Sequence, residues 1–123
     1  MPYDGHCMCG RIQVSLPQQP SQSLRCHCLG SSINYVLGDS DVTIKDSRLS
    51  LKSYGDYHTQ SGNIVLRQFC SECGSPISTK SPDFPGKTLL KASLFDEISR
   101  PSQEVFTCRR QTWEPAIEGA KQD

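Results

Sequence analysis

The sequence lacks several features that mark common classes of protein. No apolar run exceeds four residues, far short of the ~20 that a membrane-spanning helix needs. The first six residues are polar and do not resemble a secretion signal. Thirteen basic residues balance thirteen acidic ones without forming a basic stripe, which removes the electrostatic basis for nucleic-acid binding. We therefore expect a cytoplasmic protein whose partners include neither a membrane nor a nucleic acid.

Apolar residues and helical periodicity are also scarce. Apolar residues make up only 35% of the chain, so the core is thin and a bound metal would add stability that packing does not supply. No stretch keeps a 3.6-residue apolar repeat over three turns, whereas short alternating stretches between glycines and prolines predict strands. The expected strands cover residues 12–16, 33–37, 42–44, 49–51, 64–69, 88–95 and 104–108.

These patterns predict one mainly β domain with little helix over residues 1–123. Trp113 is expected in the core of a C-terminal strand. The polar residues 118–123 are expected to fray.

Cysteine, by contrast, is abundant, with seven residues. Six of them form closely spaced pairs and one stands alone: Cys7 and Cys9, Cys26 and Cys28, Cys70 and Cys73, and Cys108. Close pairs let two thiolates reach one metal ion. Six paired sulfurs exceed one tetrahedral site and fall short of two closed ones. The count therefore predicts one saturated structural metal and leaves open a second site with a free coordination position, as in catalytic zinc.

A disulfide framework is the alternative interpretation of these cysteines. The polar N-terminus, the odd cysteine count and the strain of a Cys-x-Cys disulfide all argue against it. On a strand, Cys7 and Cys9 project to the same face and can share one ion. Cys70-x-x-Cys73 followed by Gly74 is a zinc knuckle, in which glycine permits a positive φ. From spacing alone, either Cys-x-Cys pair can partner the knuckle, and an all-sulfur site favours zinc.

The order of these motifs resembles a known family. Three segments carry most of the resemblance, which extends over residues 3–119: Gly5-His6-Cys7-Met8-Cys9-Gly10, Cys26-His27-Cys28, and Arg67 through the knuckle to Pro76. They are similar to the glutathione-dependent formaldehyde-activating enzyme family, which includes centromere protein V. The resemblance implies a β-tent, meaning several small coiled antiparallel sheets pinned by zinc. It also implies that the structural zinc is held by Cys7, Cys9, Cys70 and Cys73.

The chain departs from the family's second motif, in which a Cys-His-Cys-x-x-Cys segment holds a second zinc by three cysteines. Cys26, His27 and Cys28 begin this second motif, but Ser31 stands at the third cysteine position. A neutral hydroxyl is a poor zinc ligand beside a thiolate, so we expect weak or no metal binding there. A replacement ligand would have to come from a substrate thiolate or from one of three side chains: His27, His58 or Cys108.

The resemblance implies a carbon–sulfur lyase that acts on a thiol–aldehyde adduct of the glutathione type or on a related small electrophile. Cys26 and Cys28 would then be catalytic, and His27 would move a proton. Ser31 leaves open whether the chain is an enzyme at all. Two alternatives are a zinc-stabilised binding module that has lost catalysis and a biosynthetic enzyme of the same fold. The expected partner is a small-molecule substrate, glutathione among the candidates, and the sequence leaves the oligomeric state open.

Overall fold

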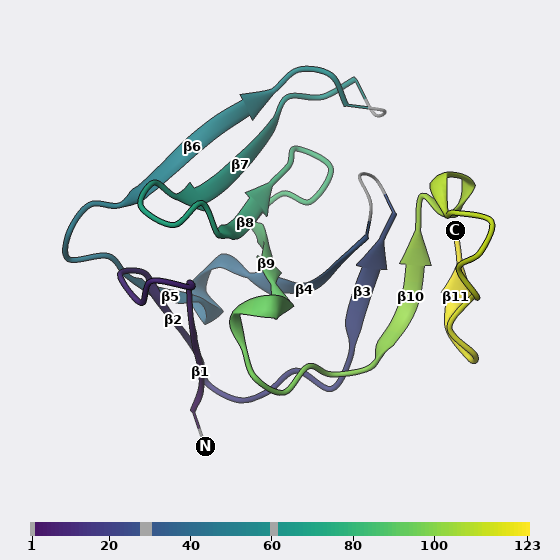
Figure 1. Ribbon diagram of the computed structural model, residues 1–123, viewed down its shortest axis with the longest axis horizontal. Helices are drawn as coiled ribbons and strands as arrows, with labels where there is room; N and C mark the ends of the chain where they lie inside the picture. The colour runs from purple at the N-terminus through teal and green to yellow at the C-terminus, as the bar shows by residue number, and fades with distance from the viewer. Residues whose placement is uncertain (1, 28–30, 60–61) are drawn as a thin grey trace.

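The computed structural model of the chain describes residues 2–27, 31–59 and 62–123. These residues form strands and short 3-10 helices, with no α-helix among them, which confirms the mainly β fold class. The strands make two sheets (Figure 1). The small sheet has the order β1-β2-β5, with β1 (Tyr3–His6), β2 (Gln13–Leu16) and β5 (Thr43–Lys45). None of the described helices is long and apolar enough to cross a membrane.

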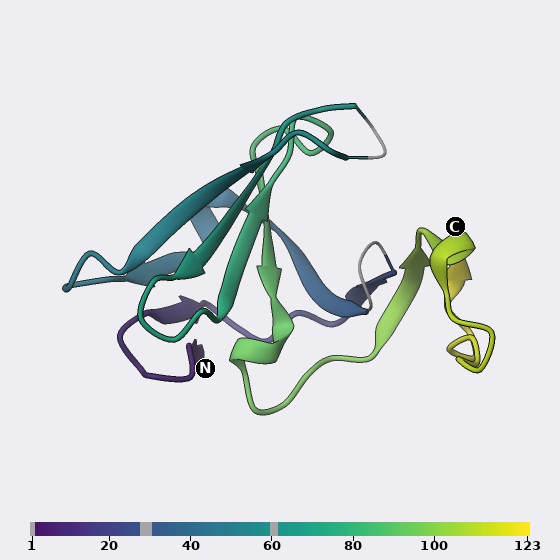
Figure 2. The same cartoon turned by 45° about the horizontal axis from the view of Figure 1, so that its top comes forward.

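The large sheet has the order β11-β10-β3-β4-β9-β8-β7-β6. Its strands, in chain order, are β3 (Ser23–Cys26), β4 (Ser32–Gly38), β6 (Leu51–Asp56), β7 (Val65–Cys70), β8 (Pro76–Lys80), β9 (Lys87–Lys91), β10 (Pro101–Val105) and β11 (Lys121–Gln122). The 3-10 helices are η1 (Asp39–Asp41), η2 (Ala92–Leu94) and η3 (Thr107–Arg109). Figure 2 shows that the sheet is coiled: β6 to β9 slope above the N-terminal strands, while β10 and the C-terminal segment lie to one side.

Most strand pairs are antiparallel, as expected, but two are parallel. β10 pairs in parallel with both β3 and β11. A parallel pair needs a long connection between its strands, and here nearly the whole large sheet is formed between β3 and β10. This pairing places Cys26 opposite Val105, so the second motif lies beside the C-terminal part of the chain.

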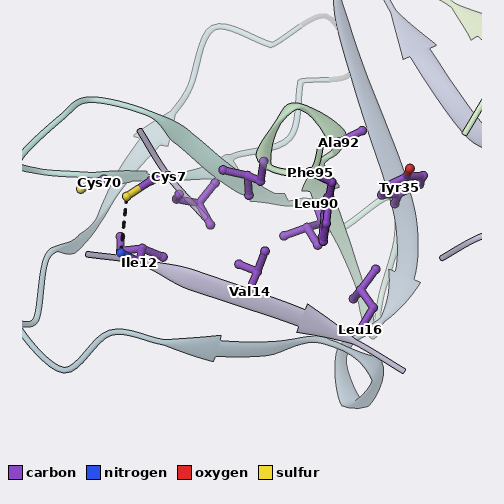
Figure 3. Close-up of a cluster of buried hydrophobic side chains, with 11 residues drawn as sticks. Cys7, Ile12, Val14, Leu16, Tyr35, Cys70, Leu90, Ala92 and Phe95 are labelled. Atoms are coloured by element: carbon purple, nitrogen blue, oxygen red, sulfur yellow. Dashed lines mark hydrogen bonds between the residues drawn. The ribbon is translucent and has the colours of Figure 1, made fainter. Parts of the chain in front are cut away.

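The core lies between the small sheet and one face of the large one (Figure 3). Val14 and Leu16 are buried on β2, where side chains alternate as predicted. They face fully buried Tyr35 on β4 and Leu90 on β9. Cys7 and Cys70 lie together at one end of this cluster, so these two cysteines extend a core that few apolar residues build.

Several expected strands form with shifted bounds. The expected strand 88–95 ends at Lys91 and continues as η2, and the expected strand 104–108 appears as β10 followed by η3. The sequence predicts none of β1, β3 and β8, which contain few alternating apolar residues. Their neighbours in the sheets, rather than their own patterns, hold these strands extended.

Two expectations for the C-terminus are wrong. Residues 118–123 do not fray, because β11 pairs with β10 and the Asp123 N–H donates to the Glu104 carbonyl oxygen at 2.9 Å. Trp113 lies outside any strand and is 78% exposed. Polar contacts rather than an aromatic core hold this end of the chain.

Candidate metal centre

Two turns that are distant in the sequence meet at one end of the core and bring four cysteines together. Cys7 and Cys9 lie in the turn between β1 and β2, Cys70 ends β7, and Cys73 lies in the turn before β8. The four Sγ atoms all lie within 4.8 Å of one another. The Cys9 sulfur is 3.6 Å from that of Cys7 and 3.7 Å from that of Cys70. The knuckle is therefore partnered by the first Cys-x-Cys pair, and the four thiols form a cluster that can hold a metal ion.

Glycines close both turns. Gly74 has a φ of 75°, as predicted for the knuckle, and its N–H donates to the Cys70 carbonyl oxygen at 2.8 Å. Gly10 has a φ of 80°, and its N–H donates to the Cys7 carbonyl oxygen at 3.0 Å. A Cβ at either glycine would meet no atom within 4 Å. The positive φ, and not lack of space, is the reason for glycine at both positions.

Main-chain and hydroxyl groups surround the sulfurs. The Ile12 N–H donates to the Cys7 Sγ at 3.4 Å (Figure 3). The Ser75 Oγ lies 3.1 Å from the Cys73 Sγ and also accepts a hydrogen bond from the Met8 N–H at 3.1 Å. These contacts join the two turns to each other and direct hydrogen-bond donors at the thiols, as around structural zinc sites.

The thiols differ in how easily they ionise. Hydrogen bonds from the Ser75 hydroxyl and main chain lower the pKa of Cys73 to about 5. A main-chain hydrogen bond from Arg11 acts to lower the pKa of Cys9, but burial and the neighbouring thiols raise it to about 11. Four adjacent thiols resist full ionisation unless a cation lies between them. A soft, four-sulfur donor set fits zinc best and leaves no open position on it, so the centre suits a structural role.

The second motif is arranged differently. Cys26 ends β3 and is partly buried, whereas Cys28 lies outside the described residues. His27 is 1% exposed, and its ring Nε2 lies 2.8 Å from Glu104 Oε1. Ser31, at the third cysteine position, accepts a hydrogen bond from Arg25 Nε at 2.8 Å.

The replacement ligands considered for Cys26 do not gather around it in the described part of the chain. Within the residues 2–27, 31–59 and 62–123, the groups of three or more metal-ligating side chains comprise the four-cysteine cluster alone. His58 is exposed after β6, and Cys108 is exposed in η3. The prediction of a second metal at Cys26 and Cys28 stays a prediction, because Cys28 is not described.

A set of charged side chains around His27 of the second motif, centred on Glu104, was not predictable from the cysteine motifs. This glutamate occupies an inward position of β10 with no exposed surface. A charged residue in a short alternating strand is ordinarily expected to face solvent. The signal available in the sequence was the concentration of opposite charges near the C-terminus, at Arg110, Glu114, Glu118 and Lys121, which lie outside the cysteine motifs in the sequence.

A cysteine cluster that fastens a small sheet to a large coiled one defines a metal-binding β protein. The family model of the glutathione-dependent formaldehyde-activating enzyme matches residues 2–109, and the chain belongs to this family. A Rhodobacter sphaeroides protein, solved by crystallography as a structural genomics target, superposes with a TM-score of 0.59 at 18% identity, covering 79% of this chain and 98% of that one. At this identity the likeness concerns the fold alone. Among curated proteins, none matches the chain.

Proposed function

We propose that this protein is a zinc-binding carbon–sulfur lyase that acts on the adduct of a thiol, of the glutathione type, with a small aldehyde. The family match over residues 2–109 carries the proposal. The four-cysteine cluster supports it, because the cluster lies at the positions that the family resemblance implies for the structural zinc. The proposal includes a reducing, cytoplasmic location, in which free thiols persist.

In this proposal the four-cysteine cluster holds the fold and the second motif carries the chemistry. During adduct formation the substrate sulfur attacks the aldehyde carbon, and the carbonyl oxygen takes a proton. The lyase direction breaks that carbon–sulfur bond and returns the proton. A metal at Cys26 and Cys28 would supply Lewis acidity that lowers the pKa of a bound thiol. The Cys26 thiol would bind or orient the substrate sulfur.

Ser31 favours a second candidate function. Its hydroxyl is engaged by Arg25, and it lacks the thiolate that the family motif places there. A chain that lost the third ligand would keep the four-cysteine cluster and its fold. It would then act as a zinc-stabilised module that presents a β surface to a protein partner.

Metal content and turnover, measured together, separate the two functions. The untagged protein is analysed for zinc per chain and assayed by NMR for exchange between glutathione, formaldehyde and their adduct. Two zinc ions, falling to one in Cys26→Ser together with loss of turnover, support the zinc lyase. Turnover with one zinc places the reaction on metal-free thiols. One zinc without turnover contradicts the lyase and supports the module. Cys108→Ser is the matched control, because Cys108 is exposed and outside the cluster.

A further inference from the structure

A buried cluster of charged side chains lies directly behind the second motif. Glu104 on β10 is fully buried, and its Oε1 is 2.8 Å from His27 Nε2 and 3.9 Å from an Arg25 nitrogen. Its Oε2 is 3.2 Å from an Arg110 nitrogen. A buried carboxylate is costly unless it is paired and hydrogen-bonded. These three partners therefore stabilise the ionised Glu104, and Arg25 and His27 link it to β3 and to the residue that follows β3.

The C-terminal segment, residues 114–122, completes the shell. The Ile117 N–H and the Gln122 side-chain amide both donate to Glu104 Oε2, at 2.8 and 2.7 Å. Glu114 accepts a hydrogen bond from Arg25 at 2.9 Å. Its carboxylate also lies 3.6 Å from His27 Nδ1, which is buried and makes no hydrogen bond. Both ring nitrogens of His27 thus face carboxylates. This segment lies beside β10 at one side of the molecule (Figure 1) and beyond the residues that match the family.

The ring of His27 determines where its neighbours point. The His27 N–H donates to the Val105 carbonyl oxygen at 3.1 Å, which continues the pairing of β3 with β10. Successive residues of an extended chain point to opposite faces. Because the His27 ring lies among the carboxylates, the Cys26 thiol is directed to the opposite face of the sheet. On the neighbouring strand β4, Ser32 is the residue paired with Cys26.

We infer that Glu104 and Glu114 are positioning residues, which hold the His27 ring and thereby fix the backbone that orients the Cys26 thiol. The C-terminal segment then helps to position the residues of the second motif. The catalytic meaning of this arrangement rests on the proposed function, whereas the orientation and accessibility of the thiol can be measured without turnover.

The test is the rate at which each cysteine of the full chain, purified with its metal, reacts with iodoacetamide, followed by mass spectrometry of its peptides. Glu114→Gln and Glu104→Gln remove the carboxylates with little change in size. The control is Glu118→Gln, an exposed carboxylate in the same segment. We expect the Cys26 rate to change about tenfold or more in Glu114→Gln and Glu104→Gln, as when a ligand loses the group that orients it. The Cys70 rate should stay within about twofold, because its sulfur lies in the separate cluster.

Equal Cys26 rates in Glu114→Gln and Glu118→Gln would overturn the positioning role. A parallel rise at Cys70 would also overturn it, because general unfolding would then explain both changes. If Glu104→Gln does not fold, Glu114→Gln decides, since the Glu114 side chain is less deeply buried than that of Glu104. The expected thiol pattern in a protein without turnover would contradict the proposed lyase and leave the positioning role standing.

Discussion

Gly5 illustrates how a single residue sets the approach of two segments next to the metal centre. It lies on β1, two residues before Cys7, and β1 packs against η2. A Cβ built on Gly5 would lie 2.4 Å from the Leu94 carbonyl oxygen and 2.9 Å from the Phe95 ring. Because one of these neighbours is backbone, the strand or η2 would have to move. Glycine at this position therefore allows the small sheet to pack closely against the core.

Gly5→Ala should destabilise the protein by about 1–3 kcal/mol, the usual cost of forcing extra volume into a packed site. The free energy of unfolding in urea measures this. Gly55→Ala is the matched control on β6, because its Cβ would come no closer than 3.7 Å to the Tyr57 ring. Equal free energies for the two variants would show that β1 does not pack against η2 as described.

At the same scale, the cysteines were predictable and the charged cluster was not. The close spacing of the cysteine pairs predicted metal ligands, and the family resemblance assigned the structural zinc to Cys7, Cys9, Cys70 and Cys73. Glu104 has no such spacing, and its partners in β3 and the C-terminal segment are distant in sequence. Whether a charged side chain is buried depends on which segments meet, and single-residue patterns do not contain that information.

At the scale of elements, strands with their own alternating apolar residues were predicted, and strands defined by their neighbours were not. β2 carries buried Val14 and Leu16 at alternate positions, and β4 carries buried Tyr35 between partly buried Ile33 and Leu37. β1 and β8 are extended because β2, β7 and β9 pair with them. The parallel pairing of β3 with β10 joins segments at opposite ends of the chain, and local sequence does not specify such a pairing.

The stability that Glu104 gives to the packing of β3, β10 and β11 should depend on pH. Burial acts to raise the pKa of Glu104, but hydrogen bonds from Gln122, Ile117 and His27 and the charge of Arg110 outweigh it and lower the pKa to about 2. Because this is below the ordinary value of 4.5, protonation favours the unfolded chain. The stabilisation is therefore complete above about pH 4.5 and is lost as the pH falls toward 2.

Urea unfolding at about pH 6 and about pH 4 tests this element, because between these values the Glu104 carboxylate protonates in the unfolded chain but stays ionised in the folded protein. The wild type and the exposed control Glu118→Gln should lose more stability on acidification than Glu104→Gln, which has no carboxylate to protonate. All three proteins share the acid sensitivity of the cysteine cluster, so this contribution cancels when their losses of stability are compared. An identical loss in all three would show that Glu104 is not paired in the folded protein.

At the scale of the whole molecule, a thin core and a four-cysteine cluster together hold the two sheets against each other. The core cluster contains few large side chains, and two of the cysteines, Cys7 and Cys70, are themselves among its buried members. Structural zinc contributes about 10–16 kcal/mol of apparent binding free energy in small domains, which is comparable to the whole stability of a domain of this size.

Removing the metal should therefore unfold most of the protein. Treatment with a strong zinc chelator under reducing conditions should abolish the β-sheet signal in circular dichroism and collapse the chemical-shift dispersion of the amide NMR spectrum. Zinc added back should restore both. A chelated protein that keeps its dispersed spectrum would show that packing alone is sufficient for the fold.

The most direct test of the central claim, that a metal on the four cysteines pins this fold, is the zinc content of the purified protein and two variants. The wild type should hold at least one zinc ion per chain. Cys70→Ser should lose this zinc and its cooperative unfolding, whereas Cys26→Ser should keep a tightly bound zinc and its fold. A wild-type protein that folds without metal, or zinc that survives in Cys70→Ser and disappears entirely in Cys26→Ser, would contradict the account.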